Sequence, residues 1–126
     1  MIVADTDVLI DALNGKEPVK ARVIEGLENG SLATTSISVF ELLSGARGQR
    51  QDRAIRTLLE ALPILELNRE VADTAAEIRQ ELEATGQTIG LADYLIAGIC
   101  VSRSAELLTR NRRHFRRVSR LRIAGL

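Results

Sequence analysis

The sequence contains few of the residues on which many binding sites and small scaffolds depend. It has no tryptophan, one tyrosine and two phenylalanines, so its core must be built from Leu, Ile, Val and Ala. Its one cysteine, Cys100, is interpreted as a small core residue; this excludes an intrachain disulfide framework and fits a reducing compartment. Its one histidine, His114, is poor material for a histidine-based metal cluster or a Ser-His-Asp triad, and is interpreted as a surface or structural residue.

Long apolar runs and nucleotide-binding motifs are missing as well. The longest apolar run, LIAGICV, is far shorter than the roughly 20 residues that cross a membrane. The opening stretch MIVADTDVLIDAL has three aspartates and no basic leader, which argues against a signal peptide. Neither a GxGxxG motif nor a P-loop occurs, so no nucleotide cofactor is indicated. We therefore expect a cytoplasmic protein with no membrane partner.

The net charge is zero, but the charges are segregated along the chain. From Arg103 onwards there are eight arginines and one acid, whereas residues 60–83 hold seven acids and two arginines. Such a chain can still present a positive surface to the phosphates of a nucleic acid. The candidates for these contacts are the arginines from Arg110 to Arg122, and the foremost group is Arg112, Arg113, Arg116 and Arg117. Alternatively, some of these arginines pair with the acidic helix expected over residues 69–85.

Short apolar stretches alternate with helical patterns over the 126 residues, which is the length of one domain. Helices are expected at 6–13, 19–27, 54–61, 69–85 and 90–103, and another runs from a cap at Ser36 or Ser38 to Gly45. Strands are expected at 2–4, 31–35, 64–67, 106–109 and 121–123. This alternation indicates an α/β domain with a parallel sheet.

Three carboxylates are placed where such a sheet forms its sites. Asp5 follows the first strand, and sites form beyond the carboxyl ends of parallel strands. Asp93 begins the apolar helix GLADYLIAG on a stripe that we expect to be buried, and Glu41 is the one charge in ISVFELLSGA. Carboxylates that converge without lysine or arginine repel one another unless a cation is present. Hard oxygen ligands suit Mg²⁺ or Mn²⁺, which activate water and stabilise charge during phosphodiester cleavage.

Each of these residues also has an ordinary structural explanation. Asp5 could cap the helix that starts at Thr6, Asp93 could complement a helix N-terminus, and Glu41 could be an exposed helix residue. The segment from Thr109 to Asn111 could orient water or substrate, or could form only a polar turn. The metal site explains all three carboxylates at once, whereas the ordinary explanations are independent of one another.

Four stretches, in this order and at this spacing, resemble a known family. IVADTDVLIDAL, TTSISVFELLSGA, IGLADYLIAG and LLTRNRRHF are similar to the motifs of PIN-domain ribonucleases, specifically the VapC toxins of VapBC toxin–antitoxin pairs. The resemblance implies one PIN-like domain over residues 1–126, with three α/β/α layers around a mostly parallel sheet of four or five short strands. It implies a Mg²⁺-dependent endoribonuclease that cuts tRNA, rRNA or mRNA, forms a homodimer and is inhibited by a cognate VapB-type antitoxin.

The same resemblance implies roles for particular residues. Asp5, Glu41 and Asp93 are the catalytic acids of the Mg²⁺ site, with Asp5 and Asp93 as its primary ligands. Thr6 and Asn111 match positions that support metal-bound water or substrate. The chain departs from the family at Asp7, where Asn or Ser is usual, so a further carboxylate can approach the site. It also departs at Asn111, where some PIN domains carry a fourth acid.

Two other functions are compatible with parts of the sequence. The opening DTDV is similar to the start of haloacid-dehalogenase-type phosphatases, but those enzymes need a phosphate-binding lysine and a late acidic pair. The only lysines here, Lys16 and Lys20, lie next to the early loop. The stronger alternative is an RNA- or partner-binding PIN-like module with little or no nuclease activity. An Asp93→Asn variant that binds RNA without cutting it would favour the enzyme.

Overall fold

The computed structural model describes residues 1–126, and a five-stranded parallel sheet forms its centre. The spatial order is β3-β2-β1-β4-β5. Ile2 in the central strand lies opposite both Leu32 and Glu106. The strands are β1 (Ile2–Ala4), β2 (Leu32–Thr35), β3 (Ile64–Leu65), β4 (Glu106–Leu108) and β5 (Arg122–Ile123). The chain therefore extends the sheet from β1 first to one side and then to the other.

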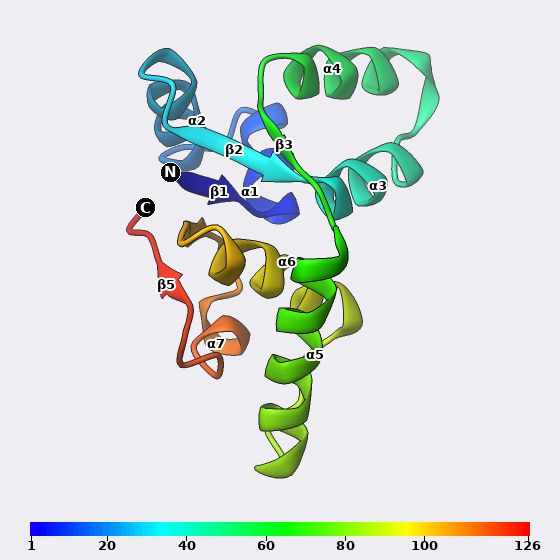
Figure 1. Cartoon of the computed structure of the whole chain (residues 1–126). Coiled ribbons are helices and arrows are strands. Elements are labelled where there is room, and N and C mark those ends of the chain that lie inside the picture. Colours follow the sequence, from blue (N-terminus) through cyan, green and yellow to red (C-terminus); the bar gives the residue numbers. More distant parts are fainter.

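Seven helices connect and cover these strands (Figure 1). Those before β3 are α1 (Thr6–Leu13), α2 (Val19–Glu28), α3 (Ser36–Ser44) and α4 (Gly48–Glu60). The later ones are α5 (Arg69–Ala84), α6 (Leu91–Ser102) and α7 (Arg112–Phe115). None of them is both long and apolar enough to cross a membrane.

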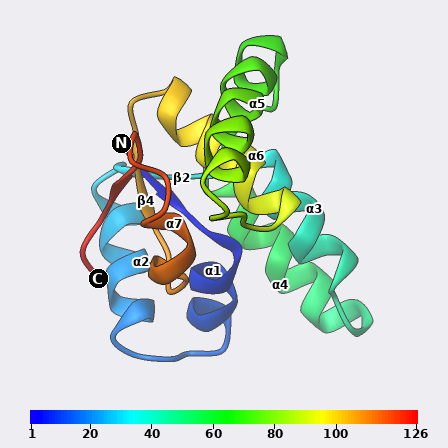
Figure 2. The same ribbon diagram turned by 90° about the horizontal axis from the view of Figure 1, so that it is seen from below.

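Alternating strand residues divide the core between the two faces of the sheet. Val3 and Leu107 contribute to the cluster that α5, α6 and α7 cover, which includes Phe115. Ala4 and Leu108 contribute to the opposite cluster, which α1, α2, α3 and α4 cover. Figures 1 and 2 show this division, with α1 and α2 on one side of the sheet and α5 and α6 on the other. The three-layer α/β/α fold predicted from the sequence is thus confirmed, with five strands.

The two longest C-terminal helices approach each other closely. A Cβ atom built on Gly98 of α6 would lie 2.8 Å from Ala75 Cβ and 3.1 Å from Ala75 Cα in α5. Only glycine permits this spacing without displacement of a neighbour. Cys100, two residues further along α6, is fully buried, as predicted for a small core residue.

Three local predictions were wrong. Helix α4 begins at Gly48 rather than at residue 54, because its polar first turns, GQRQDR, carry no apolar repeat to mark them. Helix α3 is capped by Thr35, whose side chain accepts from the Ser38 backbone N–H at 3.1 Å, rather than by Ser36 or Ser38. The short helix α7 was not expected, because its sequence RRHF contains a single apolar residue.

Candidate active site

The predicted carboxylates lie around the carboxyl ends of β1 and β4, where the strand order reverses direction. Asp5 directly follows β1, and its backbone N–H donates to the Leu108 carbonyl at 2.9 Å. Asp93 is in the first turn of α6, and Glu41 is on α3. Parallel sheets open a crevice at such a switch point, because the connections on its two sides leave in opposite directions.

Asp5 is the most buried of these acids, with 7% of its surface exposed. Its carboxylate accepts from the Thr6 backbone N–H at 2.8 Å and from Thr109 Oγ1 at 2.6 Å. The pKa of Asp5 is raised to about 6: burial is the largest cause and nearby Asp7 and Asp93 add to it, whereas the hydrogen bonds from Thr109 and Thr6 act in the opposite direction. Asp5 therefore caps α1, as its ordinary explanation proposed, and also interacts with a second site carboxylate.

Asp93 and Glu41 are electrostatic neighbours. Burial raises the pKa of Asp93, and the charge of Glu41 raises it as well, while His114 lowers it. The side chain of Asp93 is 23% exposed, so the stripe predicted to be buried opens at this residue. Deeper along α6, Ile96 and Ala97 are fully covered. Asp93 thus lies at the rim of the core, where substrate can reach its carboxylate.

Thr6 connects α1 to Glu41. Its Oγ1 donates to Glu41 Oε1 at 2.6 Å and lies 2.9 Å from Ser38 Oγ, which is buried. Ser38 belongs to the same turn of α3 as Glu41 and also lies 3.4 Å from Thr35 Oγ1. This chain of hydroxyls fixes Glu41 relative to Asp5, because Thr6 immediately follows Asp5.

Asp7, the residue at which the chain departs from the family pattern, lies near enough to Asp5 for its charge to affect the pKa of Asp5. Burial raises its pKa, and hydrogen bonding from the Arg110 backbone N–H lowers it. That N–H lies 3.3 Å from Asp7 Oδ2 and 3.4 Å from Oδ1. The carboxylate of Asp7 also contributes to the raised pKa of Asp5. Asp7 therefore adds negative charge at the edge of the site.

The side-chain atoms of this site are of the kind that binds a divalent metal ion. All of its donors are carboxylate or hydroxyl oxygens, which suits a hard divalent cation. No lysine or arginine forms an ion pair with Asp5, Glu41 or Asp93; the imidazole of His114 is nearby, with its Nδ1 3.8 Å from Asp93 Oδ2. The side chains do not form a group of three or more ligands placed around one metal position. The chemistry of the donors, with negative charge concentrated and desolvated, therefore fits Mg²⁺ or Mn²⁺.

The segment after β4 brings Thr109 and Asn111, which the sequence analysis considered, next to the carboxylates, together with His114, which it did not place there. Thr109 is fully buried, donates to Asp5 and accepts from the Asn111 backbone N–H at 3.0 Å. Asn111 Nδ2 lies 3.0 Å from His114 Nδ1, so Asn111 reaches Asp93 through the histidine. His114, interpreted from the sequence as a surface or structural residue, has a side chain that is 44% exposed, and the unexpected helix α7 brings its ring close to Asp93. The order TRNRRH directly after a buried strand was the available signal.

The arginines near the C-terminus are used in different ways. Arg112 donates from Nη1 to the Ala124 carbonyl at 3.0 Å, and Arg117 donates from Nη1 to the Thr88 carbonyl at 2.8 Å. Arg113 and Arg116 are exposed. Arg120 pairs with Glu77 of α5 at 3.1 Å, so the alternative of pairing with the acidic helix holds for this one of the candidate arginines.

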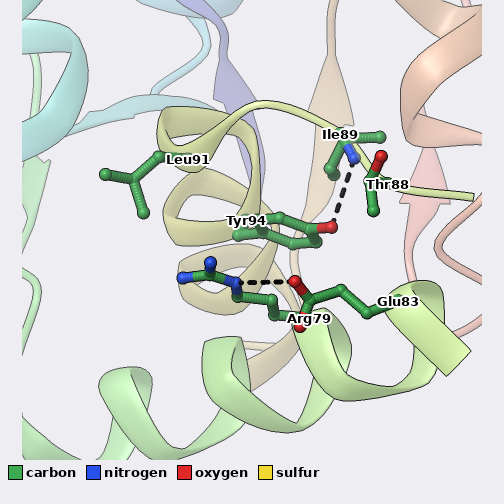
Figure 3. Close-up of a pocket in the computed structure, with 6 residues that line it drawn as sticks. All are labelled: Arg79, Glu83, Thr88, Ile89, Leu91 and Tyr94. Atoms are coloured by element: carbon green, nitrogen blue, oxygen red, sulfur yellow. Dashed lines mark hydrogen bonds and ion pairs between the residues drawn. The ribbon is translucent and has the colours of Figure 1, made fainter.

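A hollow of about 280 Å³ lies between α5, α6 and the loop before α6 (Figure 3). Tyr94 forms one wall, and its hydroxyl accepts from the Ile89 backbone N–H at 3.2 Å. Arg79 lies 6.0 Å from the Tyr94 ring centre and 3.5 Å from the Glu83 carboxylate. None of the three site carboxylates lines this hollow. The hydrogen bond between Ile89 and Tyr94 at its wall attaches the loop before Asp93 to α6.

Comparisons with known proteins agree with this fold and site. A PIN domain model matches residues 2–121, which is nearly the whole chain. The tRNA(fMet)-specific endonuclease VapC of Shigella flexneri is 31% identical over 122 residues, which cover 94% of this chain and 92% of that protein. Ribonuclease VapC10 of Mycobacterium tuberculosis is 30% identical over 91% of this chain and 86% of its own length. The chain therefore belongs to the PIN-domain family and, within that family, to the VapC proteins.

Solved structures give the same result for the fold. A chain of the VapBC2 complex from Rickettsia felis, bound to a DNA fragment from its promoter, superposes with a TM-score of 0.88. It is 26% identical, and the match covers 100% of this chain and 99% of that one. DNA-bound VapBC from Salmonella typhimurium gives a TM-score of 0.87 at 26% identity, over 98% of this chain and 96% of that one.

Proposed function

We propose that this protein is a metal-dependent endoribonuclease and the toxin of a type II toxin–antitoxin pair. The observation that carries the proposal is that Asp93 helps to raise the pKa of Asp5, and Glu41 that of Asp93, at the sheet switch point, where none of the three acids has a lysine or arginine ion-pair partner. Its relatives are named as ribonucleases or as an endonuclease specific for tRNA(fMet). VapC ribonucleases as a class depend on a metal ion. The RNA substrate, Mg²⁺ as the cofactor and the cytoplasm as the compartment complete the proposal.

Each site residue has a distinct task in this mechanism. Asp5 and Asp93 would hold the ion, and Glu41 would provide a third carboxylate to the ion or its water. Mg²⁺ bound there would polarise water for attack on phosphorus and offset the charge that develops as the phosphodiester breaks. Thr6 orients Glu41, and Thr109 orients Asp5 through its short hydrogen bond. Asn111 positions the His114 ring beside Asp93.

Apolar features of the surface support the proposal of two protein partners, an antitoxin and a second copy of the chain. An apolar hollow of about 140 Å³ between α1, α2 and α4 is lined by six hydrophobic residues and Lys20. Ile10 and Ile24 are exposed on the same two helices, α1 and α2, as expected of a groove that accepts an apolar helix. Because solved relatives are VapBC complexes, we assign this groove to a VapB-type antitoxin. Phe40 is 70% exposed and Leu91 is 66% exposed, and we assign these to a homodimer contact.

Cleavage of total cellular RNA tests the nuclease. Wild-type protein, Asp93→Asn and the matched control Asp73→Asn, an exposed aspartate of α5, are compared with Mg²⁺ and with EDTA. The proposal expects wild type and the control to cut with Mg²⁺ only, and Asp93→Asn to lose at least about a hundredfold in rate. Equal cutting by all three proteins would indicate a contaminating nuclease and reject the site. RNA binding without cutting by any of them would favour the binding module.

A further inference from the structure

Next to the carboxylate site, a buried aspartate holds an arginine. Asp11 of α1 lies one turn beyond Asp7 and is buried. Its Oδ2 lies 2.9 Å from Arg110 Nε, and its Oδ1 lies 3.9 Å from Lys16 Nζ. The backbone N–H of the same arginine lies 3.3 Å from Asp7 Oδ2. Arg110 is therefore attached to α1 at two points, through its backbone and through its guanidinium.

Arg110 differs from Arg112, Arg117 and Arg122 in the guanidinium nitrogens that it leaves free. Arg112, Arg117 and Arg122 each donate from a terminal guanidinium nitrogen to a backbone carbonyl, which ties that end of the side chain to the fold. Asp11 contacts Arg110 through Nε, and no other protein group bonds to its two terminal nitrogens. The side chain is 51% exposed. Four N–H donors thus remain available in a fixed plane, which suits two oxygens of one phosphate.

The position of Arg110 relates these donors to the site. It lies between Thr109, which donates to Asp5, and Asn111, which contacts His114. Asp11 carries one negative charge and has two cationic partners, so the group of three keeps one net positive charge. The charge of Arg110 already acts on Asp7, whose pKa it lowers. Without Asp11, the guanidinium would be free to move further towards Asp7 and the carboxylates beyond it, where it would compete with a metal ion.

We propose that Arg110 binds a backbone phosphate of the RNA beside the cleavage site, and that the buried Asp11 holds its guanidinium in place for this contact. This inference rests on the proposed function, because the ligand is its RNA substrate. Arg110 contacts substrate directly, whereas Asp11 is a positioning residue that acts through Arg110. Arg110 is one of the candidate arginines of the sequence, and its contacts with Asp11 and Asp7 distinguish it from the foremost group of four.

RNA binding in EDTA, where the RNA is not cut, tests this pair. Dissociation constants of labelled oligouridine and of unfractionated tRNA are measured by fluorescence anisotropy over a series of KCl concentrations. Arg110→Gln should raise the dissociation constant for oligouridine about tenfold and reduce the slope of its salt dependence by about 0.7. Arg110→Lys should restore the slope but only part of the affinity, because lysine keeps the charge without the planar fork. Arg69→Gln, which removes an exposed charge at the start of α5, is the matched control.

Asp11→Asn tests whether Asp11 positions Arg110 or acts only through its charge, because the two roles change RNA affinity in opposite directions. Removal of a negative charge strengthens binding to a polyanion if charge alone matters. If Asp11 positions Arg110, the same change weakens binding by about threefold, and in the Arg110→Gln background it has no weakening effect. Thermal unfolding of each variant identifies any that do not fold; if Asp11→Asn does not fold, the comparison of Arg110→Gln with Arg110→Lys decides.

Three results would overturn the inference. Arg110→Gln could behave as Arg69→Gln does, Arg110→Lys could fail to restore the salt slope, or folded Asp11→Asn could bind as tightly as wild type or more tightly. Each of these leaves the nuclease itself intact if wild type binds both RNAs. Absence of wild-type binding to either RNA would instead overturn the proposed function together with this inference.

Discussion

Replacement of Asp5 by asparagine should stabilise the metal-free protein while it abolishes cleavage. The pKa of Asp5 is about 6 in the fold, above its usual value of 3.8, because the carboxylate is buried beside other acids. Ionised Asp5 is therefore less favourable in the folded chain than in the unfolded chain. The difference corresponds to about 3 kcal/mol of unfolding free energy above pH 6. Asparagine keeps an acceptor oxygen for Thr109 but carries no charge, so it avoids most of this cost.

The pH dependence identifies the cause of the effect. An acid whose folded pKa is raised costs nothing below about pH 4, where it is protonated in both states. Its cost increases as the pH rises from about 4 to 6 and is constant at higher pH. The stability advantage of Asp5→Asn should therefore be small at pH 4 and reach about 3 kcal/mol at pH 7.5.

Urea unfolding in EDTA measures this difference at pH values from about 4 to 8, with the exposed Asp73→Asn as the control. Added Mg²⁺ should stabilise wild type and leave Asp5→Asn nearly unchanged, because the ion supplies the missing countercharge. A variant that is less stable than wild type by the same amount at every pH would refute the electrostatic reasoning. It would indicate that the hydrogen bonds of Asp5 dominate its role.

Two further substitutions test contacts that position the site. Thr109→Val should lower the unfolding free energy by about 2 kcal/mol at pH 7.5, because Asp5 loses a donor and the Asn111 N–H loses an acceptor. Thr109→Ser should keep both contacts. Equal urea midpoints for the two variants would contradict this prediction. Gly98→Ala should lower the unfolding free energy by about 1–3 kcal/mol, because its new Cβ atom would lie 2.8 Å from Ala75. Gly125→Ala is the control, because a Cβ atom there has no neighbour within 4 Å. A Gly98→Ala protein that is more stable in thermal unfolding would show that α5 and α6 separate without cost.

The sequence was sufficient for the architecture because the apolar strands and helices alternate in a simple order. Asp5 could be placed at a strand end, and Asp93 and Glu41 could be grouped because each is the lone acid of an apolar helix. Proximity of these residues follows from the topology, since the carboxyl ends of parallel strands share one edge. Their individual roles as catalytic acids remain predictions that the proposed cleavage experiment addresses.

Contacts that depend on loop geometry could not be predicted in this way. Arg110 and His114 lie in a polar segment without periodicity, and their contacts with Asp11 and Asp93 arise from the way α7 turns after β4. The cap of α3 was misplaced for a related reason, because the five positions from 34 to 38 hold four hydroxyl residues, which offer several competing caps. Side-chain pairing across a long sequence separation is invisible to local pattern.

The central position of β1 has a consequence for the cell that synthesises this protein. One neighbour of β1 is β4, which lies about a hundred residues later in the chain, and Thr109 follows that strand. A nascent chain that has left the ribosome only as far as α5 therefore lacks Asp93, Thr109 and the two strands β4 and β5 on one side of β1. The nuclease can be assembled only after β4 and Thr109 have been synthesised. A truncated translation product would carry the first two acids but no cutting site.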